Sequence, residues 1–396
     1  MRQPLSTQRG LRHFWHELLA TGLVVLIAAC GPGRDELQAG SPALLDVLGG
    51  EATGFAQALE PREFLFPRDH GPHPDYRNEW WYVTGNLAAA DGREFGYQLT
   101  FFRTSLAAEA LPRSSAWATR QAYMAHFALG DLAAGMFRAA DRFSRSALEL
   151  AGARARPFRV WIDDWSMESV EPADEAPSGS AQAVLPLRVR AGAEEVQIDL
   201  ILGAAKPVVL HGKRGLSRKG SRPGSASYYY SFTRIDTSGT VTVGGIRTAV
   251  EGHSWLDREW STSALEPQQI GWDWFALQLD DGSELMLYVM RRADGGADGA
   301  SSGTLVAPDG SSEYLPTEAF SVQVLERWVS PHSGARYPAR WRIEVPSARI
   351  LLTVQPRLAD QEIELAFRYW EGSVEVAGVH GDTRVQGLGF VELTGY

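Results

Sequence analysis

A histidine, a tryptophan and two carboxylates alternate along one short segment of this chain, residues 251–261 (EGHSWLDREWS). Alternate side chains of an extended strand point to the same face, so His253, Trp255, Asp257 and Glu259 are predicted to lie side by side. Two carboxyl groups in a hydrophobic cavity drift apart in pKa, so that one can donate a proton while the other accepts one. We therefore take the histidine and the two carboxylates as candidate catalytic residues.

A second segment of the same kind, residues 78–87 (NEWWYVTGNL), lies far upstream. In a strand, Glu79 and Trp81 share one face while Trp80 and Tyr82 share the other. An indole face stabilises a developing cation, and a carboxylate beside it can exchange a proton. Glu79 is therefore a further catalytic candidate, and the three aromatic side chains are candidates for ligand binding.

More tryptophans and one more histidine complete the candidate site. The remaining ligand-binding candidates are Trp255, Trp260, Trp272 and Trp274. His126 lies alone in an apolar strand, where a satisfied packing residue is the commoner case, and we keep it as a catalytic candidate beside that interpretation. The whole set has an alternative interpretation, because tryptophans, carboxylates and arginines can also form a hydrogen-bonded plug where two barrels meet.

A basic segment, residues 206–222, runs into three consecutive tyrosines at 228–230. It has two interpretations. It could form an anion-binding lip over an aromatic site, or it could be a solvated loop that leads into a strand.

Other kinds of site find little support. The letters of G-x-S-x-G occur at 299–303 (GASSG), but without the strand–turn–helix context that a nucleophile elbow needs. The nine histidines are scattered, and neither H-E-x-x-H nor a phosphate-binding glycine loop occurs. We expect no metal and no cofactor. The net charge of −10 is spread along the chain, which argues against nucleic acid as a partner.

The elements that must position these residues are strands. Phe95, Tyr97, Leu99 and Phe101 alternate with small or polar residues, which places the aromatic and aliphatic set on one face of a sheet. Hairpin turns are predicted by Asp-Gly pairs at 91–92, 281–282 and 309–310. The chain is predicted to be all-β and antiparallel.

A weak internal repeat suggests two similar β units in tandem. The tryptophans at 80–81 are followed by Asp-Gly-Arg-Glu at 91–94, and those at 272 and 274 by Asp-Gly-Ser-Glu at 281–284. Each pattern is that of a strand, a turn and a returning strand. We expect a first domain over residues 61–245 and a second over 246–396.

The first sixty residues are predicted to be an export and anchoring segment. Residues 1–29 have the positively charged start and short apolar run of a signal peptide, and they end in Leu-Ile-Ala-Ala before Cys30, the single cysteine. This pattern indicates a bacterial lipoprotein with a lipidated Cys30 and a flexible tether over residues 30–60. Gly31 follows the cysteine, so we expect the periplasmic side of the outer membrane.

The chain as a whole resembles the AttH-like family, which more distantly includes the carotenoid 1,2-hydratases (CrtC). The motifs that carry the resemblance are NEWWYVTGNL (78–87), YQLTFFR (97–103), SYYYS (227–231), SWLDREWS (254–261), GWDWFALQLDDG (271–282), YWEG (369–372) and GLGFVELTGY (387–396). The resemblance implies two tandem lipocalin-like (calycin) β-barrels, a hydrophobic small-molecule ligand and a neighbouring ABC-type exporter.

Three functional hypotheses follow. The first is an exported, membrane-anchored lipoprotein that binds an isoprenoid or lipid-like ligand near the barrel junction and acts on it by acid–base chemistry. The second is an enzyme like carotenoid 1,2-hydratase, whose His-x-Trp pair resembles His253-Ser254-Trp255, although its Tyr-x-Asp pair has no evident counterpart downstream. The third is a non-catalytic accessory lipoprotein of an ABC exporter.

Overall fold

Antiparallel strands make up nearly all of the regular structure in the computed structural model, which describes residues 53–109, 114–170, 179–262 and 265–396. The described residues belong to one compact unit. The predicted signal peptide, Cys30 and most of the predicted tether lie outside them. Of the helices within the described ranges, none is long and apolar enough to cross a membrane.

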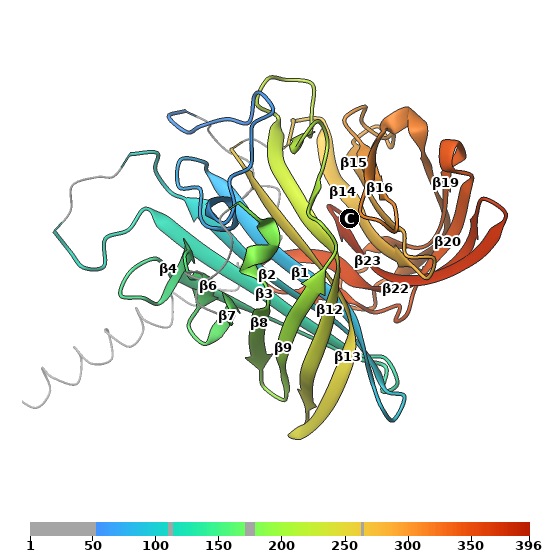
Figure 1. Ribbon diagram of the computed structural model, residues 1–396, viewed down its shortest axis with the longest axis horizontal. Helices are drawn as coiled ribbons and strands as arrows, with labels where there is room; N and C mark the ends of the chain where they lie inside the picture. Colours follow the sequence, from blue (N-terminus) through green and yellow to red (C-terminus); the bar gives the residue numbers. More distant parts are fainter. Residues whose placement is uncertain (1–52, 110–113, 171–178, 263–264) are drawn as a thin grey trace, which may run out of the picture. The chain divides into compact units, whose positions relative to one another are not determined.

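The strands form two sheets (Figure 1). In order across the first sheet they are β4 (Met136–Arg145), β3 (Gln121–Asp131), β2 (Glu94–Ser105), β1 (Asn78–Ala89), β13 (Ile246–Ser261), β12 (Ala226–Val243), β9 (Val196–Ala205), β8 (Leu187–Ala193), β7 (Trp165–Ser169), β6 (Phe158–Ile162) and β5 (Ala151–Ala155), with β10 (Val209–Leu210) and β11 (Leu216–Arg218) paired to β12. The second sheet comprises β17 (Ser312–Pro316), β16 (Ser302–Val306), β15 (Glu284–Arg292), β14 (Gln269–Leu279), β23 (Thr383–Thr394), β22 (Arg368–His380), β20 (Ile350–Pro356), β19 (Arg336–Val345) and β18 (Ser321–Val329), with β21 (Glu362–Glu364) paired to β22. Short 3-10 turns occur at η1 (Arg68–His70), η2 (Ala181–Val184), η3 (Thr317–Ala319) and η4 (Pro346–Ala348).

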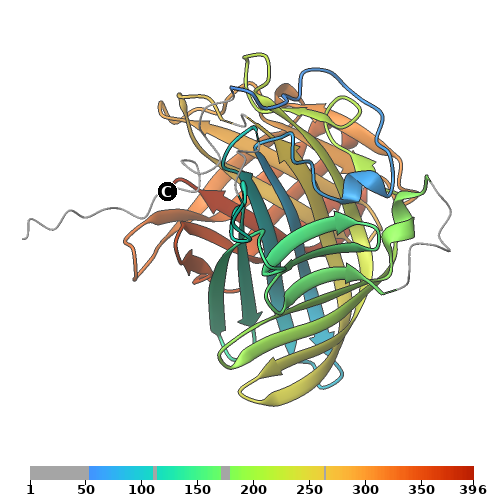
Figure 2. The ribbon, with the colours of Figure 1, turned by 90° about the vertical axis from the view of Figure 1, so that its left-hand side faces the viewer.

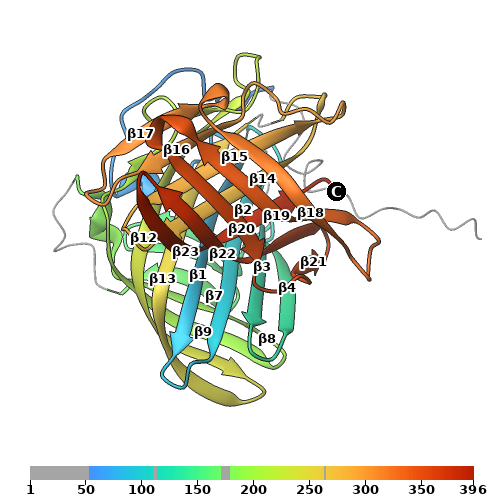
Figure 3. The same cartoon turned by 90° about the vertical axis from the view of Figure 1, so that its right-hand side faces the viewer.

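Each sheet curls into a barrel, so the predicted pair of lipocalin-like barrels is confirmed (Figures 2 and 3). Phe95, Tyr97, Leu99 and Phe101 on β2 are buried in the core of the first barrel, as their alternation predicts. Large side chains such as Trp165 fill this interior. The first barrel is therefore a packed core, and the cavity described below lies outside it.

The predicted hairpins also occur. Strands β1 and β2, β14 and β15, and β16 and β17 pair across the three Asp-Gly turns. Gly92, Gly282 and Gly310 have φ values of 86°, 83° and 86°, which glycine adopts without the steric cost of a side chain.

The two barrels pack against each other along β1 and β2 of the first sheet and β22 and β23 of the second. The Asn86 side-chain amide donates to the Gly389 carbonyl oxygen at 3.2 Å, and the Ser373 hydroxyl donates to Asn86. A Cβ atom added at Gly96 would lie 2.8 Å from the Ser373 Cβ. Glycine at position 96 therefore allows the two sheets to approach closely.

The chain passes from one sheet to the other later than the expected domain border at 245–246. That border falls at a hairpin turn inside the first sheet, between β12 and β13, where Gly244 and Gly245 have positive φ. Strand β13 pairs with β1 as well as β12, and the second sheet begins with β14 at Gln269. The motif at 251–261 thus belongs to the first sheet, because its strand, β13, lies between β1 and β12 and pairs with both.

Candidate active site

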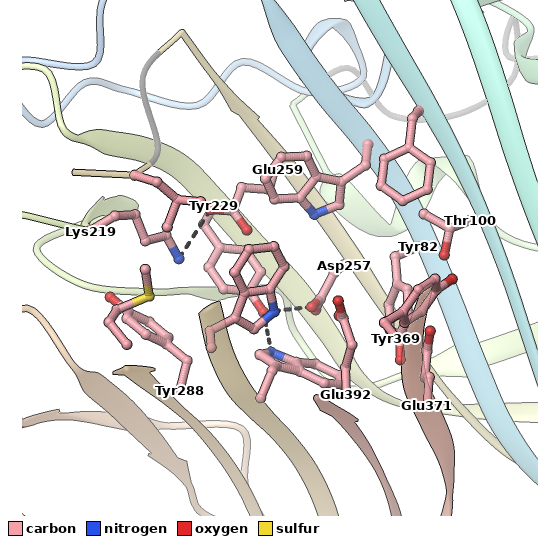
Figure 4. A pocket seen from close by; sticks show the side chains of 16 residues that line it. Tyr82, Thr100, Lys219, Tyr229, Asp257, Glu259, Tyr288, Tyr369, Glu371 and Glu392 are labelled. Carbon is pink, nitrogen blue, oxygen red and sulfur yellow. Dashed lines mark hydrogen bonds and ion pairs between the residues drawn. The ribbon is translucent and has the colours of Figure 1, made fainter. Parts of the chain in front are cut away.

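The alternation of side chains on β13 sends two sets of residues in opposite directions. Arg258 and Trp260 point into the first barrel, whereas Asp257 and Glu259 point outward into a cavity between the two sheets (Figure 4). Residues 254–261 are all buried, because one face of the strand is covered by the first core and the other by the second sheet.

The cavity has aromatic walls and carries carboxyl groups from both sheets. It encloses about 800 Å³ of empty space including its solvent-open part, of which about 90 Å³ can hold the centre of a water molecule. The four carboxyl groups are those of Asp257, Glu259, Glu371 and Glu392.

Asp257 is held by three donors. Its carboxylate oxygens accept hydrogen bonds from the Tyr229 hydroxyl at 2.5 Å, the Trp255 indole N–H at 2.6 Å and the Ser231 hydroxyl. Burial raises the pKa of Asp257 to about 7, and the charge of Glu259 acts in the same direction, although the three donors lower it. A carboxyl group with this pKa is present in both protonation states near neutral pH, which suits a general acid or base.

Glu371 and Glu392 are a cross-strand pair. They lie directly opposite each other on β22 and β23, where two like charges destabilise a sheet. Burial raises the pKa of Glu392 to about 8, with a further contribution from the charge of Asp257. Burial and the charge of Glu392 raise the pKa of Glu371 well above its usual value. The second sheet therefore contributes two carboxyl groups whose pKa values are raised.

Glu259 differs because a cation neutralises it. Lys219 Nζ lies 3.1 Å from Glu259 Oε1 and 4.0 Å from the centre of the Tyr288 ring. Burial opposes the charge of Lys219, but the Glu259 carboxylate raises the pKa of the lysine above its usual value. The cavity thus holds one ion-paired carboxylate and three carboxyl groups whose pKa values are raised.

Six of the residues proposed from the sequence line this cavity. They are Trp80, Tyr82, Asp257, Glu259, Trp272 and Trp274. Trp255 is adjacent through its hydrogen bond to Asp257. His126 lies one contact away, with Nδ1 2.7 Å from the Tyr369 hydroxyl, and burial lowers its pKa to about 4.

Glu79, Trp81 and Trp260 lie elsewhere, in the first barrel. The Glu79 carboxylate is paired with both Arg103 and Arg258. Although burial alone would raise it, the charges of the two arginines lower the pKa of Glu79 well below its usual value. The Arg258 guanidinium lies 3.9 Å from the Trp81 ring centre. The interpretation as a structural plug therefore describes these residues better than the catalytic one, because arginines neutralise the carboxylate.

His253 shares the face of Asp257, as the alternation predicts, but it lies beyond the edge of the cavity. Its side chain is 48 % exposed and its Nδ1 atom is 3.4 Å from a carboxylate oxygen of Asp236. The segment is extended as expected, and its amino-terminal end extends past the part that the second sheet covers.

Lys219, Tyr229, Glu371 and Glu392 also line the cavity, although the pattern of the sequence does not mark them as site residues. Each lies in the basic segment or in a motif that carries the family resemblance. Of the basic segment, Lys219 lines the cavity, whereas Lys213, Arg214 and Arg218 are exposed. The missed signal was a glutamate at a buried position of an apolar strand, as in FVELTGY. In the described part of the chain, no three His, Cys, Asp or Glu side chains are grouped so that they could hold a metal ion.

Known proteins share this architecture. Residues 57–396 match the model of the AttH-like family. A crystal structure from Nitrosomonas europaea assigned to AttH has a TM-score of 0.74 at 33 % identity, covering 86 % of this chain and all of that one (100 %). Kievitone hydratase from Nectria haematococca has the same fold, with a TM-score of 0.64 at 14 % identity over 86 % of this chain and 96 % of that one. The dehydratase asqC of Emericella nidulans is 25 % identical over 230 residues, 52 % of this chain and 60 % of that protein. The chain therefore belongs to the AttH-like family.

Proposed function

We propose that this protein adds water to, or removes water from, a hydrophobic small molecule held between its two barrels, with Asp257 as the general acid. The observation that carries the proposal is a buried carboxyl group on an aromatic cavity, with its pKa raised to about 7. A general acid works best when its pKa lies near the working pH.

The chemistry needs one carboxyl group that donates a proton and another group that accepts one. In hydration, Asp257 gives its proton to one carbon of an alkene, and a cation develops at the other carbon. Water adds to that carbon, and the Glu259 carboxylate takes the proton that the water loses. The indole faces of Trp272 and Trp274 stabilise the developing cation. Dehydration is the same sequence in reverse.

Two further observations support this assignment. Asp257 and Glu259 are two residues apart on one face of β13, so their Cα atoms are about 7 Å apart. A substrate between the two walls can therefore contact both groups. The relatives also support it, because one related fold belongs to a hydratase and one partial sequence match is a dehydratase, which are the two directions of one reaction.

The test combines turnover with stability at pH 6. Wild-type protein is incubated in H₂¹⁸O with a panel of hydrophobic alkenes and tertiary alcohols, and mass spectrometry detects the gain or loss of water. We expect Asp257→Asn to lower turnover of any compound that reacts by roughly 10²-fold or more, the usual loss for a general acid. Its melting temperature should stay near that of the wild type, because the amide resembles the neutral carboxyl group.

The matched control is Asp236→Asn on the neighbouring strand β12, where the side chain is 71 % exposed. It should keep full turnover. Unchanged turnover in Asp257→Asn would rule out the general-acid role. A large fall in melting temperature with turnover retained would mean that Asp257 supports the barrel junction instead.

A further inference from the structure

One end of the cavity is polar in a way that the hydration chemistry does not use. Tyr82 and Thr100 come from the first sheet, and Tyr369 and Glu371 come from the second. Figure 4 shows these four side chains grouped together, on the opposite side of Asp257 and Glu392 from Lys219. We call them the polar end. They occupy one place because Tyr82 and Thr100 are direct cross-strand neighbours on β1 and β2.

Neighbouring buried side chains hold two of these residues, Thr100 and Tyr369, in position. The Gln98 amide donates to the Thr100 hydroxyl oxygen at 2.7 Å, so the hydroxyl proton of Thr100 is free to donate. Nδ1 of His126, the cross-strand neighbour of Thr100 on β3, lies 2.7 Å from the Tyr369 hydroxyl. The polar end is thus oriented by a second row of buried polar residues.

The other two side chains have hydrogen-bonding capacity that the protein does not satisfy. The Tyr82 hydroxyl and the Glu371 carboxyl group are buried and interact with each other, and among the described residues neither the hydroxyl nor Glu371 Oε1 makes a hydrogen bond of good geometry to any other group. They lie close enough for Glu371 to raise the pKa of Tyr82, after the larger effect of burial. More than nine in ten buried polar groups in proteins have a hydrogen-bond partner, so two such atoms on one cavity wall point to a ligand group.

We propose that the polar end binds a hydroxyl or carbonyl oxygen of the ligand, which makes the ligand an uncharged, oxygen-bearing hydrophobic molecule rather than a hydrocarbon. A pure hydrocarbon would cover the Tyr82 hydroxyl and Glu371 and leave them only each other as partners. A carboxylate ligand would bring a charge to an end of the cavity where none of the lining residues is a cation. A hydroxyl group both donates and accepts, and it therefore matches the mixture of groups at the polar end. This inference rests on the proposed function, because it assumes that the same cavity binds the ligand.

The experiment uses small probes of similar size and the full mature chain at pH 6. The neutral dye N-phenyl-1-naphthylamine reports cavity binding by fluorescence, and competitors displace it: 2-naphthol, 2-methylnaphthalene and 2-(aminomethyl)naphthalene. In the wild type we expect 2-naphthol to bind about tenfold more tightly than 2-methylnaphthalene, the effect of one added hydrogen bond. In Tyr82→Phe this preference should fall to nearly one, while the affinity for 2-methylnaphthalene stays the same.

The matched control is Tyr123→Phe, which removes the hydroxyl of a tyrosine buried in the core of the first barrel and should keep the tenfold preference. Glu371→Gln provides a second test should Tyr82→Phe fold poorly by its melting temperature, and it should also reduce the preference. Equal affinity for 2-naphthol and 2-methylnaphthalene in the wild type would overturn the proposal that the polar end binds a ligand oxygen, but the binding of hydrophobic molecules would still stand. If 2-(aminomethyl)naphthalene, the ammonium compound, binds most tightly, the proposal is also overturned, because the cavity walls would then select for a cation. Failure of the dye and all competitors to bind would count against the proposed function as well.

Discussion

Two buried clusters lie against opposite faces of the same strand, β13, and the protein holds their carboxyl groups in opposite ways. On the inner face, Arg258 meets Glu79, which Arg103 also neutralises. On the outer face, Asp257 lies in a cavity with Glu371 and Glu392. Both clusters contain a buried carboxyl group and lie beside tryptophans, so the sequence around the carboxyl groups does not distinguish them.

The difference lies in the cations. In the inner cluster each oxygen of Glu79 has its own arginine, and the pKa of the carboxyl group is lowered despite burial. In the cavity the one lysine among the lining residues pairs with Glu259, and the pKa values of the other three carboxyl groups are raised by burial. A buried carboxyl group with arginines is a permanent charge that supports the fold. A buried carboxyl group without them can exchange a proton.

The largest expected effect breaks the inner cluster. Glu79→Gln leaves the charges of Arg103 and Arg258 buried without compensation, so we expect the free energy of unfolding at pH 7 to fall by about 3–5 kcal/mol. Urea denaturation followed by tryptophan fluorescence measures this. The matched change on the outer face, Glu371→Gln, should alter stability by less than about 1 kcal/mol at the same pH. Similar losses of unfolding free energy in the two variants would show that the arginines do not make Glu79 more important for stability than Glu371.

The second prediction concerns the pH dependence of stability, which has opposite signs for the two clusters. The folded-state pKa values of Asp257 and Glu392 are raised to about 7 and about 8, so the folded protein binds more protons than the unfolded chain from about pH 4 upward. Their contribution therefore becomes less favourable as the pH rises through 7 and 8. Glu79, with its lowered pKa, contributes stability above its ordinary pKa that is lost as the pH falls through its folded value.

The double variant Asp257→Asn, Glu392→Gln should remove the fall in stability that the two raised pKa values cause toward alkaline pH. Denaturation at pH 5, 7 and 8.5 should show wild-type stability falling toward pH 8.5. The double variant should be more stable than the wild type there by several kcal/mol, because each unit of a raised pKa corresponds to about 1.4 kcal/mol. Parallel curves for the two proteins between pH 5 and 8.5 would contradict the raised pKa values.

The smallest expected effect comes from the histidine that the alternation places beside Asp257. His253 is 48 % exposed and contacts an exposed aspartate, so His253→Ala should change stability by less than about 0.5 kcal/mol. Binding of N-phenyl-1-naphthylamine should not change, because the side chain lies outside the cavity. A tenfold loss of dye affinity in this variant would show that the binding site extends along β13 as far as His253.

Much of the fold follows from local patterns. Alternation along β2 predicts which side chains enter the core, and the Asp-Gly pairs predict hairpins, because both depend on neighbours within a few residues. The shared face of Trp255, Asp257 and Glu259 follows from the same period of two. The expected domain border falls inside the first sheet for a related reason, since two glycines in a row mark a turn but do not say which sheet the next strand joins.

The functional difference between the carboxyl groups could not be predicted in this way. Glu79 and Glu259 occur in similar tryptophan-rich sequences, yet one meets two arginines and the other a lysine from a distant loop. Glu371 and Glu392 reach the cavity only because the second sheet folds back against β1 and β2. The period of a strand, and hence which residues share a face, is a property of the sequence itself. Whether that face meets a core, a cavity or water is decided by the packing of elements more than a hundred residues apart, and burial together with the nearest charge then sets the protonation of each carboxyl group.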